Sequence, residues 1–323
     1  MNFDPYPLKF KRMLKELVWG GRKLESVFNK KLPPGVPVGE SWEVVDLPGD
    51  QSIVLNGRYK ESSLENLVAE YRKEIMGEKQ LLDGRFPLLL KIIDAGRTLS
   101  VQVHPDEKTA ARLGGRPKTE AWYIIDVEPE AFIYAGLNPG VSKDDFAGAI
   151  RKGTVENLLN RVYVKPGDFV YLPSGTIHAL GAGVLLIEIQ QASNTTYRVY
   201  DWGRKGLDGK PRQLHVEQAL ESIDFSVSGA PSVPPAGDCT EGIASEFFVF
   251  GKKRCSSGDT QAIHTGESPV ILFAIEGKGT VSGETPSQKM EFEKGETLML
   301  PAYMTSADLH AETEFEWLEI SIP

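Results

Sequence analysis

A histidine-rich metal site has few candidate ligands in this sequence, because its 323 residues include only five histidines. Ser100, Gln102 and His104 alternate along an expected strand, so their side chains share one face, and Pro105 ends the strand. Glutamine and histidine at the end of a strand suit a site at the mouth of a β-barrel. Taken alone, the pattern is explained better by a half-buried strand with a polar outer face.

Two further residues, Glu120 and His178, gain meaning in combination with this strand. Glu120 opens the run EAWYIID, and alone it could be an exposed residue at a strand edge. His178 follows a tight turn in PSGTIHAL, and alone it could be a structural residue held by hydrogen bonds. The ordered spacings resemble the two cupin motifs, which bring two histidines, a carboxylate and a later histidine into one barrel. The positions that carry the resemblance are Gly96, Gln102, His104 and Glu120, followed by Gly167, Pro173, Gly175 and His178. Gln102 stands where the usual pair has its first histidine.

The resemblance extends along most of the chain and points to one family. Similarity to type I phosphomannose isomerases, in their short bacterial or archaeal form, is carried by WGGRKL, GESWEVVD, FPLLLKIIDAGRTLSVQVHPDE, KTEAWYIID, GDFVYLPSGTIHALGAG and QQASNTTYRVYDW. It is strong from Trp19 to about Trp202 and weak in the C-terminal quarter, where only the β pattern agrees. The resemblance implies an enzyme that interconverts mannose 6-phosphate and fructose 6-phosphate.

The same resemblance implies a set of site residues. One zinc ion would be bound by Gln102, His104, Glu120 and His178. The active-site basic residues would be Lys118 and Arg198, and the active-site carboxylate would be Glu188. The phosphate contacts would be Lys91 and Ser100. Zinc suits two imidazoles, a carboxylate and an amide oxygen with one position left to solvent. Two histidines and a carboxylate also hold iron(II) in oxygenases, but Gln102 would fill a position that oxygen chemistry needs, which favours a Lewis-acid role.

Aldose–ketose isomerisation moves protons between C1 and C2 and between O1 and O2, so it needs a base and groups that stabilise the enediolate oxygens. Lys118 lies two residues before Glu120 and would share its face of a strand, where a metal would lower the lysine pKa; a surface lysine is the alternative. Glu188 lies in the apolar run GVLLIEIQQ, where a carboxylate needs a partner or a function. Which of the two is the base stays open. Arg198 can hold an anion with two hydrogen bonds or pair with Asp201.

The rest of the sequence predicts a mainly β protein of cupin (jelly-roll) barrels with a few short helices. Short apolar or alternating runs bounded by Gly and Pro recur from SWEVVDL to FEWLEISI. Helices are expected over 62–79, with Ser62 and Glu65 as a capping box, and over 142–153, with Ser142 and Asp145 at the same spacing. Two shorter helices are expected over 154–162 and 215–223.

A stretch rich in Ser, Gly and Pro, residues 226–240, is expected to link a catalytic cupin domain with helical insertions (1–225) to a smaller cupin-like β domain (241–323). The segment GDFVYLP at 167–173 recurs as GETLMLP at 295–301, which indicates a β unit used twice. The first copy leads to His178 and the second to Ser306, and neither His264 nor His310 fits a metal-motif spacing. The N-terminal barrel is therefore expected to hold the one metal ion.

Composition restricts the partners and the location. Lys and Arg total 36 against 45 Asp and Glu, and the net charge of −9 argues against a nucleic-acid backbone or an acidic membrane surface as partner. No apolar run approaches the roughly 18 residues that span a bilayer, no signal peptide is evident, and Cys239 and Cys255 form no disulfide framework, so a cytoplasmic location is expected. The expected partner is a small sugar phosphate, and the chain is expected to be a monomer or homodimer. An iron-dependent cupin oxygenase and a non-catalytic sugar-phosphate-binding cupin are the alternatives.

Overall fold

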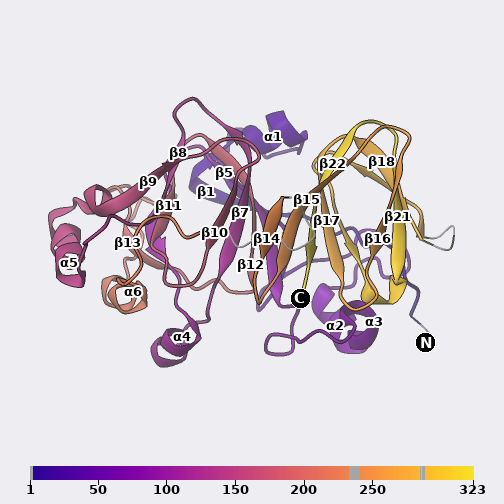
Figure 1. Cartoon of the computed structure of the whole chain (residues 1–323), viewed down its shortest axis with the longest axis horizontal. Coiled ribbons are helices and arrows are strands. Elements are labelled where there is room, and N and C mark those ends of the chain that lie inside the picture. The colour runs from indigo at the N-terminus through magenta and orange to yellow at the C-terminus, as the bar shows by residue number, and fades with distance from the viewer. Residues whose placement is uncertain (1–2, 233–240, 284, 286–287) are drawn as a thin grey trace.

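The computed structural model describes residues 3–232, 241–283, 285 and 288–323. Strands in these ranges form two pairs of sheets, and the pairs lie side by side, the N-terminal pair in purple to magenta and the C-terminal pair in orange to yellow (Figure 1). This arrangement confirms the mainly β, cupin-type fold. The expected domain limits at 225 and 241 stay a prediction, and residues 233–240, including Cys239, lie outside the described ranges.

The N-terminal barrel consists of a six-stranded and a five-stranded antiparallel sheet. In spatial order the first sheet contains β1 (Met13–Gly21), β2 (Val38–Val44), β5 (Leu88–Ala95), β12 (Val184–Gln191), β7 (Glu120–Val127) and β10 (Phe169–Leu172). The second contains β13 (Tyr197–Tyr200), β6 (Val101–Val103), β11 (His178–Leu180), β8 (Phe132–Leu137) and β9 (Leu159–Tyr163). A small hairpin of β3 (Asp46–Leu47) and β4 (Asp50–Gln51) follows β2.

The C-terminal barrel repeats the strand order of the first. Its sheets contain β14 (Gly242–Ala244), β15 (Val249–Cys255), β22 (Phe315–Ser321), β17 (Val270–Glu276) and β20 (Thr297–Leu300), and then β16 (Thr260–His264), β21 (Ser306–Ala311), β18 (Lys278–Ser282) and β19 (Met290–Glu293). The orders β5-β12-β7-β10 and β15-β22-β17-β20 match, as do β6-β11-β8-β9 and β16-β21-β18-β19. The repeated motif is therefore confirmed as one β unit used twice, with β10 and β20 at the same sheet edge.

The helices are short and differ in part from the expectation. They are α1 (Lys23–Phe28), α2 (Leu64–Glu70), α3 (Arg72–Met76), α4 (Glu107–Leu113), α5 (Lys143–Lys152) and α6 (Val216–Ser222), with 3₁₀ turns η1 (Val155–Leu158) and η3 (Ala302–Met304). The capping box of Ser142 and Asp145 on α5 is confirmed, as is the helix near 215–223.

Two helix predictions were wrong. The helix expected over 62–79 is broken at Tyr71, which leaves the helical conformation at φ −127° and ψ 44° where its ring packs on Phe3 and Tyr59. Its cap is Ser63, which accepts from the amide of Asn66, and not Ser62. The helix expected over 154–162 is one 3₁₀ turn followed by β9, because pairing with β8 outweighs local propensity.

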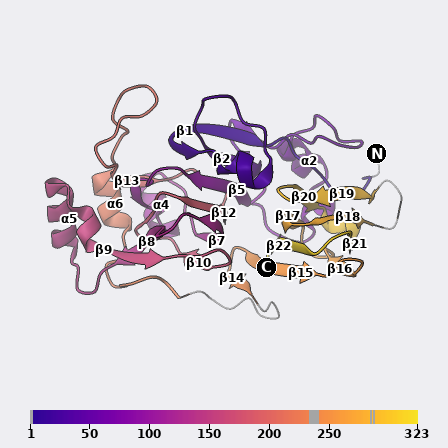
Figure 2. The same cartoon turned by 90° about the horizontal axis from the view of Figure 1, so that it is seen from above.

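Strand alternation gives the large sheet two different faces. Ile93, Trp122 and Leu186 point into the N-terminal barrel. The residues next to them in sequence, such as Ile92 and Ile187, point the other way and belong to a second core that is shared with the C-terminal barrel. In Figure 2, the strands of the two barrels that carry this shared core lie next to each other, seen from above. Polar residues that alternate with the outward-facing residues therefore point into the N-terminal barrel. The sheet that carries them is apolar on its outer face.

Candidate active site

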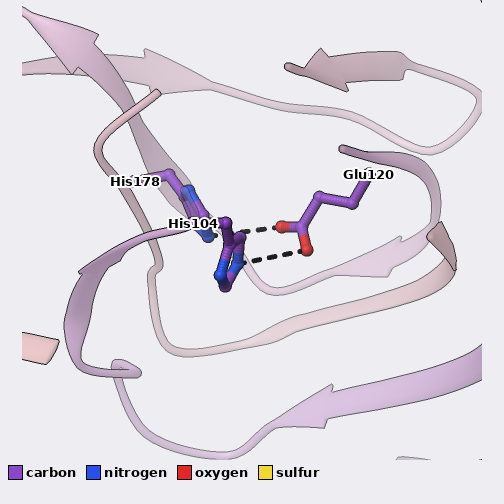
Figure 3. A group of neighbouring side chains, drawn as sticks. All are labelled: His104, Glu120 and His178. Atoms are coloured by element: carbon purple, nitrogen blue, oxygen red, sulfur yellow. Dashed lines mark ion pairs between the residues drawn. The ribbon is translucent and has the colours of Figure 1, made fainter. Parts of the chain in front are cut away.

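Three side chains from separate strands converge inside the N-terminal barrel. His104 follows β6, Glu120 begins β7 and His178 begins β11, and their ligand atoms all lie within 4.8 Å of one another (Figure 3). His104 Nε2 is 3.3 Å from Glu120 Oε2, and His178 Nε2 is 3.2 Å from Glu120 Oε1. All three are at most 2 % exposed. The solvated edge proposed as an alternative for Glu120 is therefore wrong.

Backbone carbonyls orient both imidazoles. His104 Nδ1 lies 2.8 Å from the oxygen of Thr195, and His178 Nδ1 lies 2.9 Å from the oxygen of Thr176. A carbonyl can only accept, so each Nδ1 carries the hydrogen and each Nε2 presents a lone pair toward Glu120. Burial, and then the charge of Lys118, lower the pKa of His104 to about 3, so this ring is neutral at neutral pH.

Glu120 stays ionised inside this buried cluster. Burial alone would raise the pKa of Glu120, but Lys118, followed by His104 and His178, lowers it well below its ordinary range. Lys118 Nζ is 2.8 Å from Glu120 Oε2 and the lysine is buried, so the alternative of a surface lysine is wrong. The expectation that Lys118 shares the face of Glu120 is consistent with this contact.

The cluster has the donor set of a metal site. His104 Nε2 and both oxygens of Glu120 are buried and have no geometrically good hydrogen bond, which is costly unless another group satisfies them. Two neutral imidazole nitrogens and a carboxylate are ligands that divalent transition metals accept. A bound divalent ion would supply the missing partner of all three atoms, so these residues fit a metal.

Gln102 stands next to this cluster. It pairs directly with His178 across β6 and β11, and its Nε2 lies 3.3 Å from His178 Nε2. Ser100 donates to Gln102 Oε1 at 3.3 Å. A half-turn of the amide would place Oε1, its metal-binding atom, beside His178. Gln102 is thus in reach of a fourth ligand position.

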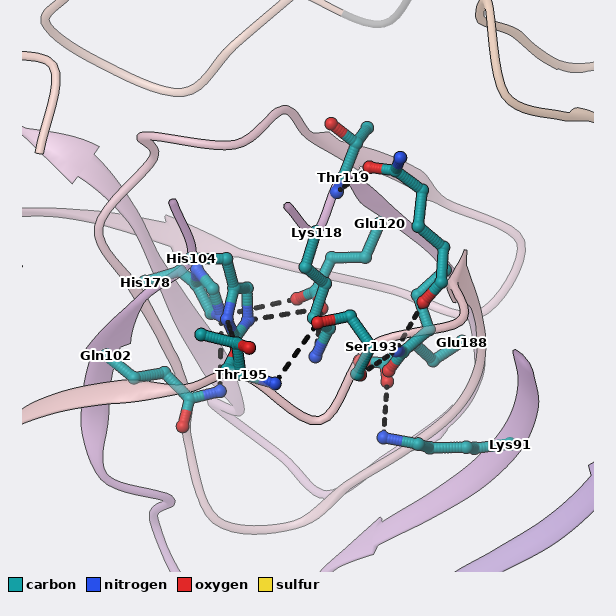
Figure 4. Close-up of polar contacts among 12 residues, drawn as sticks. Lys91, Gln102, His104, Lys118, Thr119, Glu120, His178, Glu188, Ser193 and Thr195 are labelled. Atoms are coloured by element: carbon teal, nitrogen blue, oxygen red, sulfur yellow. Dashed lines mark hydrogen bonds and ion pairs between the residues drawn. The ribbon is translucent and has the colours of Figure 1, made fainter. Parts of the chain in front are cut away.

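A second buried polar group occupies the large sheet, beside the first. Glu188 Oε1 lies 3.2 Å from Lys91 Nζ (Figure 4). Its Oε2 accepts from Trp122 Nε1 at 2.9 Å. Lys91 also faces Glu40 at 3.8 Å. Burial would lower the pKa of Lys91, but Glu40 and Glu188 raise it. Lys91 does not extend to solvent, and Glu188 has the partner that its apolar strand requires.

Arg198 lies on β13 at the far side of the pocket. Its Nε donates to Ser100 Oγ at 3.0 Å and its Nη1 to the carbonyl of Gln213 at 3.0 Å. The alternative pairing with Asp201 is not formed, because Arg204 and Arg212 hold that carboxylate. Burial, and then Arg212, lower the pKa of Arg198.

Nearly all of these side chains line one pocket of about 160 Å³. Its walls include Lys91, Ser100, Gln102, Lys118, His178, Glu188 and Arg198, together with Glu40, Trp122 and Arg212. His104 and Glu120 lie behind this surface, in contact with residues that line it. The structure thus brings every residue singled out in the sequence into one site.

Sequence reasoning missed several residues of the pocket. Glu40, Trp122 and Arg212 line it, and Thr195 orients His104 through its backbone. Trp122 could have been found, because it follows Glu120 by two positions and shares its strand face. Glu40 and Arg212 come from distant segments, and no local pattern marks them.

The described residues of the C-terminal barrel form no equivalent cluster. Across the part of the chain that the structure describes, His104, Glu120 and His178 are the single group of at least three His, Cys, Asp or Glu side chains placed to hold a metal. His264, set aside for its spacing, pairs with Ser306 as Gln102 pairs with His178. Val270 pairs with Leu300 where Glu120 pairs with Leu172, and apolar side chains fill the barrel.

The described helices include none long and apolar enough to cross a membrane.

Comparison with known proteins places this site in a family. A family model described as the catalytic domain of type I phosphomannose isomerase matches residues 8–133. The chain is 40% identical over 309 residues to the mannose-6-phosphate isomerase ManA of Bacillus subtilis, covering 91% of this chain and 93% of the relative. It is 37% identical to the mannose-6-phosphate isomerase of Streptococcus mutans, covering 95% and 96% of the two chains.

Solved structures agree with these sequence relatives. The structure of a mannose 6-phosphate isomerase from Bacillus subtilis superposes with a TM-score of 0.86 and 34% identity, covering 98% of this chain and 99% of the other. A putative mannosephosphate isomerase from Archaeoglobus fulgidus shares the fold, with a TM-score of 0.79 at 22% identity over 99% and 98% of the chains. With the sequence relatives covering nearly its whole length, the chain belongs to the type I phosphomannose isomerase family.

Proposed function

We propose that this chain is a zinc-dependent, cytoplasmic isomerase that interconverts mannose 6-phosphate and fructose 6-phosphate. The observation that carries the proposal is the buried cluster of His104, Glu120 and His178 next to a pocket lined by basic groups, with unpartnered ligand atoms on His104 and Glu120. Gln102 is proposed as the fourth ligand. When bound, zinc would polarise the sugar oxygens at C1 and C2 and so acidify the adjacent C–H.

Two side chains are proposed to transfer protons, one to and from the carbons C1 and C2 and one to and from a sugar oxygen. Glu188 lines the pocket, and each of its oxygens keeps acceptor capacity beyond the contacts with Lys91 and Trp122. Lys118 also lines the pocket, and in this structure it forms an ion pair with Glu120. Glu188 therefore suits the role of acceptor, and Lys118 that of donor to a sugar oxygen.

The remaining basic groups are proposed to hold the negative charge of the substrate. Arg198 would stabilise the enediolate, since a guanidinium offers two parallel donors to an oxyanion. Lys91 and Ser100 are proposed to contact the substrate at its phosphate end. An oxygenase is disfavoured because the family comparisons name isomerases throughout.

The direct test is turnover of mannose 6-phosphate by the zinc-loaded protein, with glucose 6-phosphate as the control sugar. Formation of fructose 6-phosphate from mannose 6-phosphate alone, with and without oxygen, supports the proposal, and absence of product refutes it. His104→Ala and His178→Ala should each lose both bound zinc and turnover, because each removes a ligand. His310→Ala is the matched control, since this histidine is exposed in the C-terminal barrel and should leave both unchanged.

A further inference from the structure

Three arginines gather around a single carboxylate at one end of the pocket. Arg204 donates to Asp201 Oδ1 through Nε at 2.9 Å and Nη2 at 2.7 Å. Arg212 donates to Oδ2 through Nε at 2.7 Å and to Oδ1 through Nη2 at 2.5 Å. Arg198 is close enough that both other arginines contribute to its lowered pKa, after burial. Three cations against one anion leave this group, the arginine cluster, with a net charge of +2.

The members of the arginine cluster differ in how fully their donors are used. All three guanidinium nitrogens of Arg204 donate, two to Asp201 and Nη1 to the carbonyl of Thr98. In contrast, Nη2 of Arg198 and Nη1 of Arg212 have no hydrogen-bond partner among the described residues. Arg198 and Arg212 both line the pocket, whereas Arg204 does not. Arg204 therefore holds the cluster together, and the other two keep donors for a ligand.

The two lysines that line the pocket supply no spare positive charge. Lys91 lies 3.2 Å from Glu188 and 3.8 Å from Glu40, so two carboxylates oppose one ammonium. Lys118 is matched by Glu120 at 2.8 Å. Lys91 alone therefore cannot balance a phosphate monoester, which carries close to two negative charges at neutral pH.

We infer that Arg212 binds the phosphate group of the substrate at the Ser100 end of the pocket, and that the neighbouring charge of Arg198 adds to the attraction. This inference rests on the proposed function, because it takes the substrate to be a sugar phosphate. The net charge of the arginine cluster matches a dianion, and guanidinium groups match the geometry of phosphate oxygens. Asp201 fixes the Arg212 side chain from behind, so little side-chain freedom is lost when the ligand binds.

The test is the affinity of Arg212→Gln for inorganic phosphate and for mannose 6-phosphate. The zinc-loaded variant should show a weaker Kd for inorganic phosphate by titration calorimetry and a higher KM for mannose 6-phosphate. Both constants should change by the same factor, about tenfold or more, as for one lost charged hydrogen bond. The kcat should change far less than KM, because Arg212 contacts the phosphate and not the reacting carbons. Arg212→Lys keeps the charge and should recover part of the affinity.

Arg151→Gln is the matched control, because it removes one exposed arginine from the end of α5 and should change neither constant. An unchanged phosphate Kd in a folded Arg212→Gln overturns the inference, as does a loss confined to kcat. If Arg212→Gln does not fold, the same two constants are measured for Arg212→Lys and Arg198→Lys. Wild-type phosphate Kd and wild-type KM in both lysine variants would overturn the inference. Phosphate titration does not require turnover. A wild-type protein that binds phosphate through Arg212 but forms no fructose 6-phosphate would refute the proposed function and leave this inference standing.

Discussion

The buried pair of Lys91 and Glu188 offers a way to separate what the site does for folding from what it does for chemistry. Two unit charges 3.2 Å apart attract by about 5 kcal/mol at an effective dielectric constant of 20, but most of that offsets the loss of hydration. Removing one partner of such a pair costs about 3–5 kcal/mol, because the other charge is left buried. Glu188→Gln keeps the side-chain volume and the acceptor for Trp122, and Glu40 still faces Lys91, so the expected cost is about 3 kcal/mol.

The double variant sharpens this prediction. Lys91→Met should cost a similar amount, since it strands the carboxylate of Glu188. Lys91→Met combined with Glu188→Gln leaves neither charge unpaired, so its loss should be at least about 2 kcal/mol smaller than the sum of the single losses. Guanidinium unfolding of the metal-free proteins, with unchanged m values, measures the three free energies. We expect the double variant to regain stability but not turnover. If the two single losses sum to the loss of the double variant within about 0.5 kcal/mol, the two charges do not depend on each other and the reasoning fails.

Three further predictions follow from the same geometry. Arg198→Ala should lower kcat by about two orders of magnitude with zinc still bound, and Arg198→Lys should rescue it poorly; a near-normal kcat with bound zinc would return Arg198 to a structural role. Gln190→Ala should weaken zinc affinity by roughly tenfold or more. The Gln190 Nε2 donates to the carbonyls of Gln191 and Ser193 at 2.8 Å each, and so holds the loop whose Thr195 carbonyl orients His104. Competition with a chelator measures the zinc affinity, and a wild-type value would contradict the prediction. Reconstituted protein should contain one metal ion per chain by elemental analysis, and a value near two that His264→Ala lowers to one would overturn the reading of the C-terminal barrel.

The metal cluster could be predicted because the ordered spacing of its residues resembles the cupin motifs and the isomerase family. Taken singly, His104, Glu120 and His178 each had a structural explanation. Strand alternation alone supports a smaller inference, that Lys118 lies beside Glu120. An acidic residue in an apolar strand likewise predicts that Glu188 is buried with a partner.

The surroundings of Asp201 could not be predicted in this way. Arg204 and Arg212 reach this carboxylate from an irregular segment between β13 and α6, whose path no periodicity describes. The sequence suggested Arg198 as the partner, because Arg198 is near in sequence. The break at Tyr71 has the same origin, since contacts with Phe3 and Tyr59 come from outside the helix. Long-range packing decided each of these features.

The strands that carry Lys91 and Glu188 have a second role on their outer face. Leu90, Ile92 and Ile187 alternate with Lys91 and Glu188 and are buried in the core shared with the C-terminal barrel, against residues such as Phe273. The C-terminal barrel thus behaves like an obligate subunit fused into the same polypeptide. A catalytic half produced alone would expose a broad apolar face and tend to aggregate. The second barrel therefore supports the first through the surface that it presents to it, and this role needs no metal cluster.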